Sequence, residues 1–431
     1  MSAPISFQRK KSVMELLHAL RPDEHYPLTA MVEIADRCNE ACVHCYQVQG
    51  QKGELSTDEW KRILDDLAEL GVLLLTISGG EATLRKDFLE LVAHARARGF
   101  AVKIYTNGLR VDRPMAQRLG ELAVQEVQIS LYSPRAEVHD EVTRVPGSFD
   151  KTVAAVRHLR EAGIAVMVKT PLMKDNAGDM DAYIDLARSL DADFGFDPTI
   201  DPRENGDATP EALAPDDDAL LRARRHRVLA PFAGTSDFER SLDGSVCGAC
   251  SGSVHVEANG EMRPCTQLQV PVGHALEDGV RPAWERNETG LAIRNIRWRD
   301  LHGCRDCDLR HVCGRCFARA RVEANDALAP YRSACRRAKM SYELAHGVAP
   351  EIAPGEREDT DVGPFRRVGE HAFEAVEDVV TEADRARARS QGWVRPDASL
   401  VQIRRRTVRR EGEDLPRVGE PSLNSSRLPL V

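Results

Sequence analysis

The sequence lacks an uninterrupted apolar run long enough to span a bilayer, which takes about 20 residues. Its first 20 residues hold no long apolar core followed by a small-residue cleavage site, which argues against secretion. An excess of basic charge is also missing: 59 Lys and Arg stand against 68 Asp and Glu, a net charge of −9. Nothing therefore marks the whole chain as a nucleic-acid-binding protein. These absences predict a cytoplasmic protein without a membrane partner.

The eleven cysteines are too dilute over 431 residues for a disulfide scaffold. Three form a Cys-x3-Cys-x2-Cys group at Cys38, Cys42 and Cys45, and the other eight lie between Cys247 and Cys335. Buried inert thiols would not be expected to cluster in this way. In a reducing compartment, clustered cysteines favour metal binding over disulfides.

The division into three and eight cysteines suggests iron–sulfur chemistry. A 4Fe–4S cluster takes four thiolates, so the first group would leave one iron open, and eight cysteines can close two complete clusters. Zinc is the alternative in both regions. His44 could be the fourth ligand of a zinc knuckle, and Cys304–Cys316 could form a zinc ribbon.

Between Leu28 and about Ile200, short β-rich runs alternate with helical patterns, which implies a parallel sheet. The expected strands are 31–35, 73–78, 101–105, 126–131, 165–169 and 193–196, and the expected helices are 57–70, 86–98, 113–122, 149–162 and 179–190. The predicted fold class is α/β, a partial (β/α)6 TIM-like barrel. Function in such barrels gathers at the carboxyl ends of the strands.

The expected organisation has five parts. They are an N-terminal segment (1–27), the barrel (28–200), a Pro- and Asp-rich linker (201–245) with a helical stretch at 211–229, a small cysteine-rich domain (246–340) and a partly disordered C-terminal extension (341–431) with a helix at 372–390. A basic run at Arg404–Arg410 could bind an acidic peptide or nucleic acid, although such runs are more often simply solvated.

Three features together resemble a known family. The cysteine group is followed by Tyr46, and Ser78-Gly79-Gly80-Glu81 ends the next predicted strand. This combination resembles the radical S-adenosylmethionine (radical SAM) enzymes. The later cysteines resemble the SPASM extension of those enzymes, which carries two auxiliary clusters. The similarity covers roughly Leu28 to Lys339, and its nearest functional types are peptide maturases and anaerobic sulfatase maturases.

The resemblance implies contacts to SAM at the ends of successive strands. Glu81 would accept from the ammonium group, Asn107 would lie on the ribose side, and Ser130 would face the ribose or the carboxylate. Arg144 would pair with the carboxylate. Taken singly, these residues could be a turn, a loop hydroxyl and a surface charge. The full set of expected cofactor-binding residues is Tyr46, Gly79, Gly80, Glu81, Asn107, Ser130 and Arg144.

The same resemblance implies three 4Fe–4S clusters. Cys38, Cys42 and Cys45 would hold the radical SAM cluster. The first auxiliary cluster would take Cys247, Cys250, Cys265 and Cys316, and the second Cys304, Cys307, Cys313 and Cys335. The spacing of two residues before Cys316, where three is usual, departs from the family pattern. Spacing alone does not establish which auxiliary cysteines share a cluster.

The implied activity is reductive cleavage of SAM to a 5′-deoxyadenosyl radical, which abstracts hydrogen from a peptide or protein, as in the maturation of ribosomally made peptides. An electron donor such as a flavodoxin or ferredoxin is expected. Only about 28 residues precede the first strand, too few for a fused leader-binding domain, so a separate leader-binding protein, the tail or the barrel mouth would recognise the substrate. The alternatives are oxidation of a small molecule such as an aminoglycoside or alcohol, and a non-catalytic iron–sulfur electron carrier.

Overall fold

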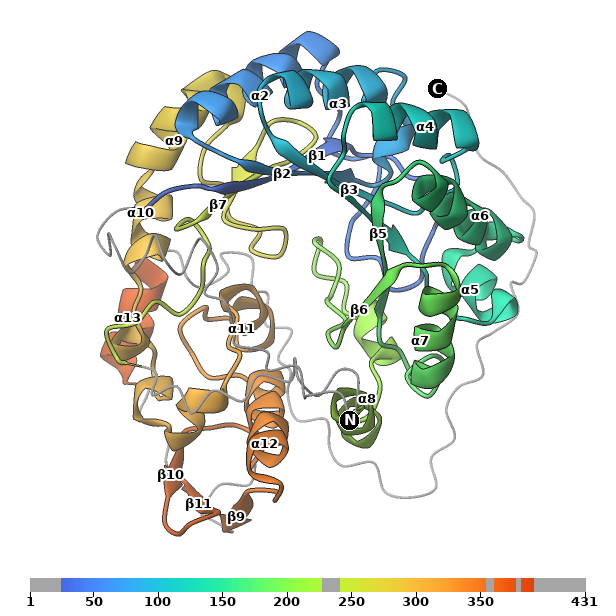
Figure 1. Cartoon of the computed structure of the whole chain (residues 1–431). Coiled ribbons are helices and arrows are strands. Elements are labelled where there is room, and N and C mark those ends of the chain that lie inside the picture. The colour runs from blue at the N-terminus through green and yellow to red at the C-terminus, as the bar shows by residue number, and fades with distance from the viewer. Residues whose placement is uncertain (1–24, 227–240, 354–359, 377–380, 391–431) are drawn as a thin grey trace, which may run out of the picture.

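The computed structural model describes residues 25–226, 241–353, 360–376 and 381–390. Its main feature is a curved eight-stranded sheet in the order β6-β5-β4-β3-β2-β1-β7-β8 (Figure 1). The six barrel strands are β1 (Thr29–Ala35), β2 (Leu74–Gly79), β3 (Ala101–Thr106), β4 (Glu126–Ser130), β5 (Ala165–Pro171) and β6 (Asp193–Asp197). All neighbouring pairs among these six are parallel, which confirms the partial barrel.

Helices cover the outer face of this sheet (Figure 1). They are α2 (Thr57–Leu70), α3 (Phe88–Ala97), α4 (Arg113–Glu121), α5 (Ala136–Thr143), α6 (Ser148–Glu161) and α7 (Met180–Ser189). Helix α2 begins at a capping box between Ser56 and Glu59 and ends at Gly71, whose φ of 102° is left-handed. Within the barrel, the predicted bounds of the strands and helices differ from those observed by no more than two residues, and α5 is the barrel helix that was not predicted. The helical stretch predicted at 211–229 begins six residues before the observed helix at Asp217–Arg225, and residues 227–229 lie outside the described residues.

The cysteine-rich region extends the sheet of the barrel. Strand β7 (Ser253–Val256) pairs in parallel with β1, and β8 (Met262–Arg263) pairs antiparallel with β7. Helices α9 (Val280–Arg286) and α10 (Glu288–Asn295) follow, and one hydrophobic core runs from the barrel into this region. The two regions therefore share a sheet and a core.

The remaining elements lie below the barrel as drawn in Figure 1. They are α8 (Asp217–Arg225), α11 (Phe317–Glu323), α12 (Arg332–His346), the small sheet β9 (Glu351–Ala353), β10 (Phe365–Arg367) and β11 (Ala372–Ala375), and α13 (Glu382–Ser390). The predicted helix at 372–390 is wrong in its first part, because residues 372–375 pair with β9 and β10 as a strand. The basic run at 404–410 lies outside the described residues.

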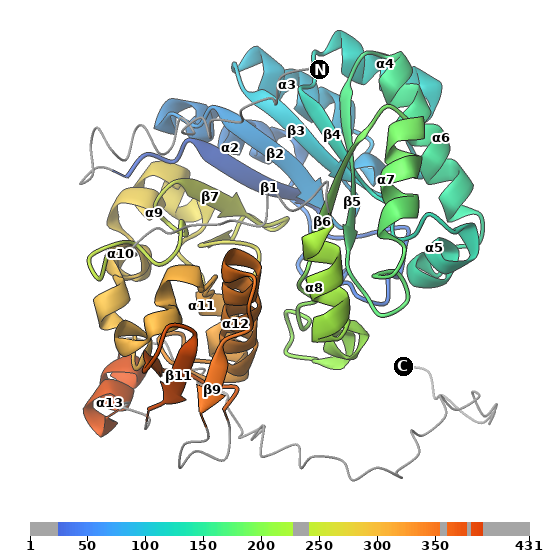
Figure 2. The ribbon, with the colours of Figure 1, turned by 60° about the horizontal axis from the view of Figure 1, so that its bottom comes forward.

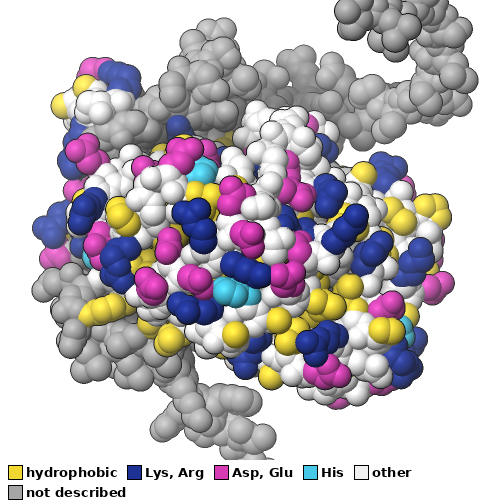
Figure 3. All heavy atoms as spheres, turned by 90° about the horizontal axis from the view of Figure 1, so that it is seen from above, with side chains coloured by type: hydrophobic (Ala, Val, Ile, Leu, Met, Phe, Trp, Pro, Cys, Tyr) yellow, Lys and Arg dark blue, Asp and Glu magenta, His cyan; other side chains and the backbone are white. Residues whose placement is uncertain are grey.

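No helix in the described ranges combines the length and the apolar character needed to cross a membrane. On the face over the outer helices, seen from above in Figure 3, acidic and basic side chains are interspersed. That face therefore has no large patch of a single charge.

The carboxyl end of β2 packs directly against the backbone that follows β1. The amide of Gly80 donates to the carbonyl of Ala35 at 2.8 Å, and the amide of Glu81 donates to the carbonyl of Arg37 at 2.9 Å. A Cβ atom at Gly79 would lie 2.4 Å from the Ala35 oxygen, and one at Gly80 would lie 2.5 Å from the Arg37 oxygen. The two glycines therefore permit contact between two parts of the chain itself, in addition to any role toward a ligand.

We expect Gly80→Ala to lower the free energy of unfolding by about 1–3 kcal/mol, because the new methyl group overlaps backbone that the sheet holds in place. Chemical denaturation measures this change. The control is Gly178→Ala, whose Cβ would meet no atom within 4 Å and should change stability by less than about 0.5 kcal/mol. Equal stability of the two variants would contradict the close contact.

Candidate active site

The first cysteine group lies on the loop after β1, where the predicted barrel places function. The segment at the end of α5 holds this loop: the amides of Ala41 and Val43 donate to the carbonyls of Thr143 and Val142, each at 3.1 Å. Within the loop, the Cys45 amide donates to the Cys42 carbonyl at 3.1 Å. The loop is therefore held between α5 and the end of β2.

The three thiols of this loop lie close enough to influence one another. Burial raises the pKa of Cys38 to about 12, and the nearby Cys45 adds to the rise. Burial also raises the pKa of Cys42, with a further contribution from Glu40, whose Oε2 lies 3.2 Å from the Cys42 sulfur. A bound metal would convert such thiols to thiolates. The buried Oε1 atom of Glu40 has no hydrogen-bond partner. A buried carboxylate oxygen without a partner, next to three thiols, fits a positively charged group bound at the sulfurs.

Glu81 is 1% exposed and its carboxylate joins β2 to β3. Oε1 accepts from the amide and hydroxyl of Thr83, at 3.0 and 2.6 Å, and from the Thr106 hydroxyl at 2.8 Å. Oε2 accepts from the amide of Asn107 at 2.7 Å. The carboxylate is thus engaged by four protein donors, and its expected contact with the SAM ammonium group stays a prediction.

Asn107 connects this carboxylate to the cysteine loop. Its side-chain amide donates to Asn39 Oδ1 at 2.8 Å and lies 3.8 Å from the Cys38 sulfur. Its own Oδ1 accepts from the Leu109 amide at 3.0 Å. The structure therefore places Asn107 beside the first cysteine group, and sequence reasoning did not anticipate Asn39 as its partner.

A central cavity of about 240 Å³ opens beside the loop, within the curve of the sheet. Ser130 and Tyr46 line it, together with Lys169, whose ammonium lies 5.1 Å from the centre of the Tyr105 ring. The Tyr46 hydroxyl donates to Glu33 at 3.2 Å, so this ring is fixed in the cavity wall. The cavity provides space for a ligand next to the cysteines.

Arg144 does not line the central cavity. It is exposed and ends α5 with a φ of 62° in the left-handed region. Residues 142 and 143, which hold the cysteine loop, precede it directly. Its backbone is thus near the loop, and the predicted pairing of its side chain with a carboxylate stays a prediction.

Sequence reasoning missed Tyr132, two residues after Ser130. Its hydroxyl lies 3.6 Å from the Cys42 sulfur, and its ring contacts His44 edge-on with centroids 4.6 Å apart. The backbone amide of Tyr132 donates to His139 Nδ1 at 3.1 Å. An aromatic residue just beyond the end of a barrel strand was the signal that could have identified it.

Four of the later cysteines gather near the β7–β8 hairpin. Burial raises the pKa of Cys265 to about 11, and Cys316 and Cys247 add to the rise. Burial raises the pKa of Cys250 to about 12, and Cys265 and Cys247 add to it. The structure thus brings together the four residues expected to share the first auxiliary site.

The other four cysteines line one small cavity. These are Cys304, Cys307, Cys313 and Cys335. The C-terminal extension covers them: the Gly363 amide lies 3.0 Å from the Cys335 sulfur and the Phe365 amide 3.4 Å from the Cys307 sulfur, both as donors. The prediction of a separate extension from residue 341 did not anticipate this contact. All eleven cysteines are free of disulfides.

An open parallel barrel with three free cysteines after its first strand defines the class of radical SAM enzymes. The sequence profile of the radical SAM superfamily matches residues 32–187. The mycofactocin maturase MftC of Mycolicibacterium smegmatis is 31% identical over 314 residues, which cover 68% of this chain and 78% of that protein. The chain belongs to the radical SAM superfamily, and it is accordingly an enzyme that uses SAM and a 4Fe–4S cluster.

Two further relatives match most of their own length. The AdoMet-dependent heme synthase of Methanosarcina barkeri is 28% identical over 327 residues, 69% of this chain and 93% of that protein. The PqqA peptide cyclase of Rhodopseudomonas palustris is 28% identical over 327 residues, 70% of this chain and 85% of that protein.

Solved structures share the fold at low identity. Native anSMEcpe with bound AdoMet aligns with a TM-score of 0.60 and 16% identity, over 74% of this chain and 97% of that chain. Streptococcus suis SuiB bound to precursor peptide SuiA aligns with a TM-score of 0.57 and 18% identity, over 71% of this chain and 75% of that chain.

We expect Glu81→Gln to lower the free energy of unfolding by about 1–3 kcal/mol, because an amide nitrogen in place of one oxygen leaves a buried donor unpaired. Denaturation of the metal-free protein isolates this effect from any contact with SAM. Glu59→Gln is the control, since Glu59 caps α2 in an exposed position and should cost less. An unchanged unfolding curve for Glu81→Gln would contradict the role of this carboxylate in joining β2 to β3.

Proposed function

We propose that this enzyme modifies a peptide or protein by radical chemistry, as in the maturation of ribosomally made peptides. The observation that carries the proposal is the three-cysteine loop at the edge of the central cavity, with two further groups of four cysteines nearby. The relatives named as a peptide cyclase and a peptide-bound enzyme support the substrate class.

A cluster held by Cys38, Cys42 and Cys45, together with bound SAM, would supply one-electron radical chemistry able to break a substrate C–H bond. The chain's own residues position these groups. We propose that Cys38, Cys42 and Cys45 hold the cluster and that the Gly79–Glu81 segment, Asn107 and Ser130 border SAM. Tyr132 and Tyr46 restrict water at the cavity wall.

We further propose that the two groups of four cysteines hold auxiliary 4Fe–4S clusters. The first comprises Cys247, Cys250, Cys265 and Cys316, and the second Cys304, Cys307, Cys313 and Cys335. Eight thiolates suffice for two complete clusters, and amide donors directed at the sulfurs of Cys335 and Cys307 are groups that tune cluster potentials. Fully ligated clusters would serve electron transfer.

The remaining partners follow from this chemistry. Reductive cleavage needs an external one-electron donor, for which a flavodoxin or ferredoxin is suited, and a separate leader-binding protein could deliver the peptide. A reducing, cytoplasmic setting agrees with eleven cysteines free of disulfides.

A small-molecule substrate is the second candidate. The relative named as a heme synthase, which aligns over 93% of its own length, favours it. The mass of the product distinguishes the two candidates, because turnover changes the mass of a peptide in the first and of a small molecule in the second.

The activity test uses anaerobically reconstituted full-length enzyme with SAM and dithionite. We expect 5′-deoxyadenosine by chromatography, and a mass change in a short precursor peptide encoded beside the gene. Cys42→Ala should abolish 5′-deoxyadenosine, because three thiolates are needed to leave one iron open. Absence of 5′-deoxyadenosine from fully loaded wild-type enzyme would overturn the proposal, and turnover of a small molecule in place of the peptide would favour the second candidate.

The cluster count is tested by iron analysis. We expect about twelve irons per chain, four per cluster, and about eight in Cys335→Ala. The triple change of Cys38, Cys42 and Cys45 to Ala should also leave about eight, with the auxiliary clusters retained. About four irons in the intact, fully reconstituted enzyme would refute the auxiliary clusters and leave the radical SAM assignment standing.

A further inference from the structure

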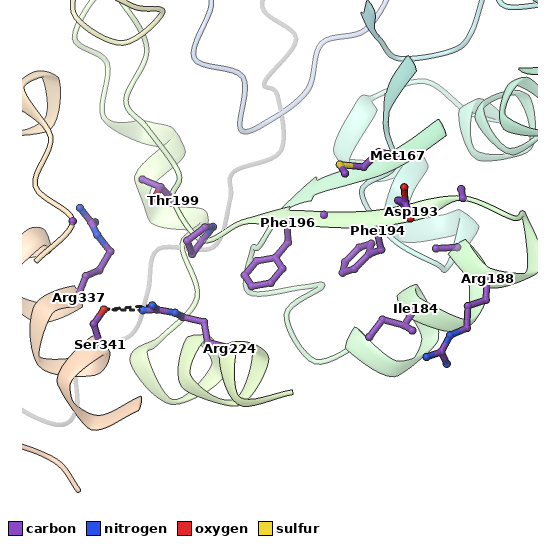
Figure 4. A pocket seen from close by; sticks show the side chains of 15 residues that line it. Met167, Ile184, Arg188, Asp193, Phe194, Phe196, Thr199, Arg224, Arg337 and Ser341 are labelled. Carbon is purple, nitrogen blue, oxygen red and sulfur yellow. Dashed lines mark hydrogen bonds between the residues drawn. The ribbon is translucent and has the colours of Figure 1, made fainter. Parts of the chain in front are cut away.

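A second, larger cavity of about 750 Å³ lies at the open edge of the barrel. Strand β6 and α7 line one part of it, and residues of α8 and α12 line the rest (Figures 2 and 4). Helix α8 lies beside β6, and Leu220 and Ala223 of α8 pack in one core with Phe194 and Phe196. Phe194, Phe196 and Ile184 make part of the lining apolar (Figure 4). None of the motifs described above uses this cavity.

Strand β6 presents an unpaired edge to this cavity. It ends the sheet order and pairs only with β5, in a register from Met167↔Asp193 to Pro171↔Asp197. Among the described residues, no strand pairs with its other edge. Such an edge offers free N–H and C=O groups to an added strand, and extended peptides bind proteins in this way.

Two arginines on the α8 and α12 side of the cavity form no ion pair with a described residue, although Asp201 lies close enough to Arg337 for their charges to interact. Among the described residues, the Arg224 guanidinium of α8 donates to the Ser341 hydroxyl, at 3.3 and 3.4 Å (Figure 4). Arg337 of α12 forms no ion pair or hydrogen bond with any described residue. Burial, and then the charge of Arg337, lower the pKa of Arg224. Two close, partly buried cations that form no ion pair with a described residue favour an anionic ligand.

The arginines next to these two in the sequence, in contrast, each form an ion pair. Arg225 forms an ion pair with Glu343, and Arg336 forms one with Asp217 at 2.7 Å, so these two neighbours pair across the α8–α12 interface. Arg224 and Arg337 both line the cavity.

The cavity also leads to the candidate active site. Thr199, just after β6, lines both this cavity and the central one. Gly314, between Cys313 and Cys316 in the sequence, lines the outer cavity as well. A segment running along β6 toward its carboxyl end would reach the central cavity at Thr199.

We propose that this cavity docks an extended, acidic segment of the peptide substrate, which pairs with the free edge of β6 and places carboxylates on Arg224 and Arg337. That the occupant is the substrate rests on the function proposed above. Strand β6 has five residues, and at about 3.3 Å per residue a segment of about five residues spans it. Its side chains alternate, so acidic residues at every second position face the arginines.

The test uses full-length, anaerobically reconstituted enzyme and a fluorescein-labelled octapeptide of alternating Glu and Val. We expect saturable binding by fluorescence anisotropy, and binding at least about tenfold weaker for the matching Lys–Val peptide. Arg224→Glu and Arg337→Glu should each weaken binding of the acidic peptide by about tenfold or more, since each removes a hydrogen bond between charged groups. Methylation of alternate backbone nitrogens on one edge of the peptide should also weaken binding, because that edge pairs with β6.

Arg222→Glu is the matched control, because Arg222 lies two residues before Arg224 on α8, is exposed and does not line the cavity. It changes the net charge equally and should alter affinity less than about twofold. Iron content and thermal unfolding establish that each variant is folded. Equal weakening by Arg222→Glu, no effect of Arg224→Glu and Arg337→Glu, or no binding of the acidic peptide to wild type would each overturn the proposal. The mass change of the precursor peptide tests the proposed function separately, since it does not depend on binding of the octapeptide.

Discussion

The contact between Gly79-Gly80 and the backbone after β1 is the constraint on which the rest of the candidate site depends. Two amides of this turn donate to the carbonyls of Ala35, the last residue of β1, and of Arg37 in the cysteine loop, and no side chain fits between the two segments. Glu81 follows this turn and is buried, and its carboxylate joins the end of β2 to the end of β3 by accepting hydrogen bonds from Thr106 and Asn107. Cysteine loop, turn and Asn107 are thus held as one unit, and pre-organisation of this kind is what positions a cofactor for reaction.

The barrel and the cysteine-rich region share one sheet, and this shared sheet fixes their relative position. Strand β7 continues the sheet beside β1, so the hairpin that leads to Cys265 is tied to the strand that leads to Cys38. Buried ion pairs reinforce the junction: Lys52 bridges Glu204 and Glu257 at 2.6 and 3.2 Å. Breaking such pairs is costly because a charge is left buried and uncompensated. These contacts join the cysteine loop, the segment after β6 and the cysteine-rich region at one point.

Burial of the cysteines disfavours their thiolate form, because desolvation penalises the charge. At the second group of four, the C-terminal extension increases this burial. Phe365 and Phe373 pack in one core with Cys335 and Leu309, and two backbone amides point at sulfurs. The extension therefore belongs to the environment of these cysteines, and water is kept from them by residues far along the chain.

The sequence by itself determined the βα alternation, the barrel and the cysteine groups, because apolar periodicity and ligand spacing are local signals. Only the tertiary structure showed that Glu81 is occupied by four protein donors, that Arg144 does not line the central cavity, and that residues 372–375 form a strand. It alone also brought Asn39 to Asn107, Gly363 to Cys335, and Arg224 beside Arg337. The physical reason is that each of these contacts joins segments whose separation in the chain carries no periodic signal, and packing alone decides which segments meet.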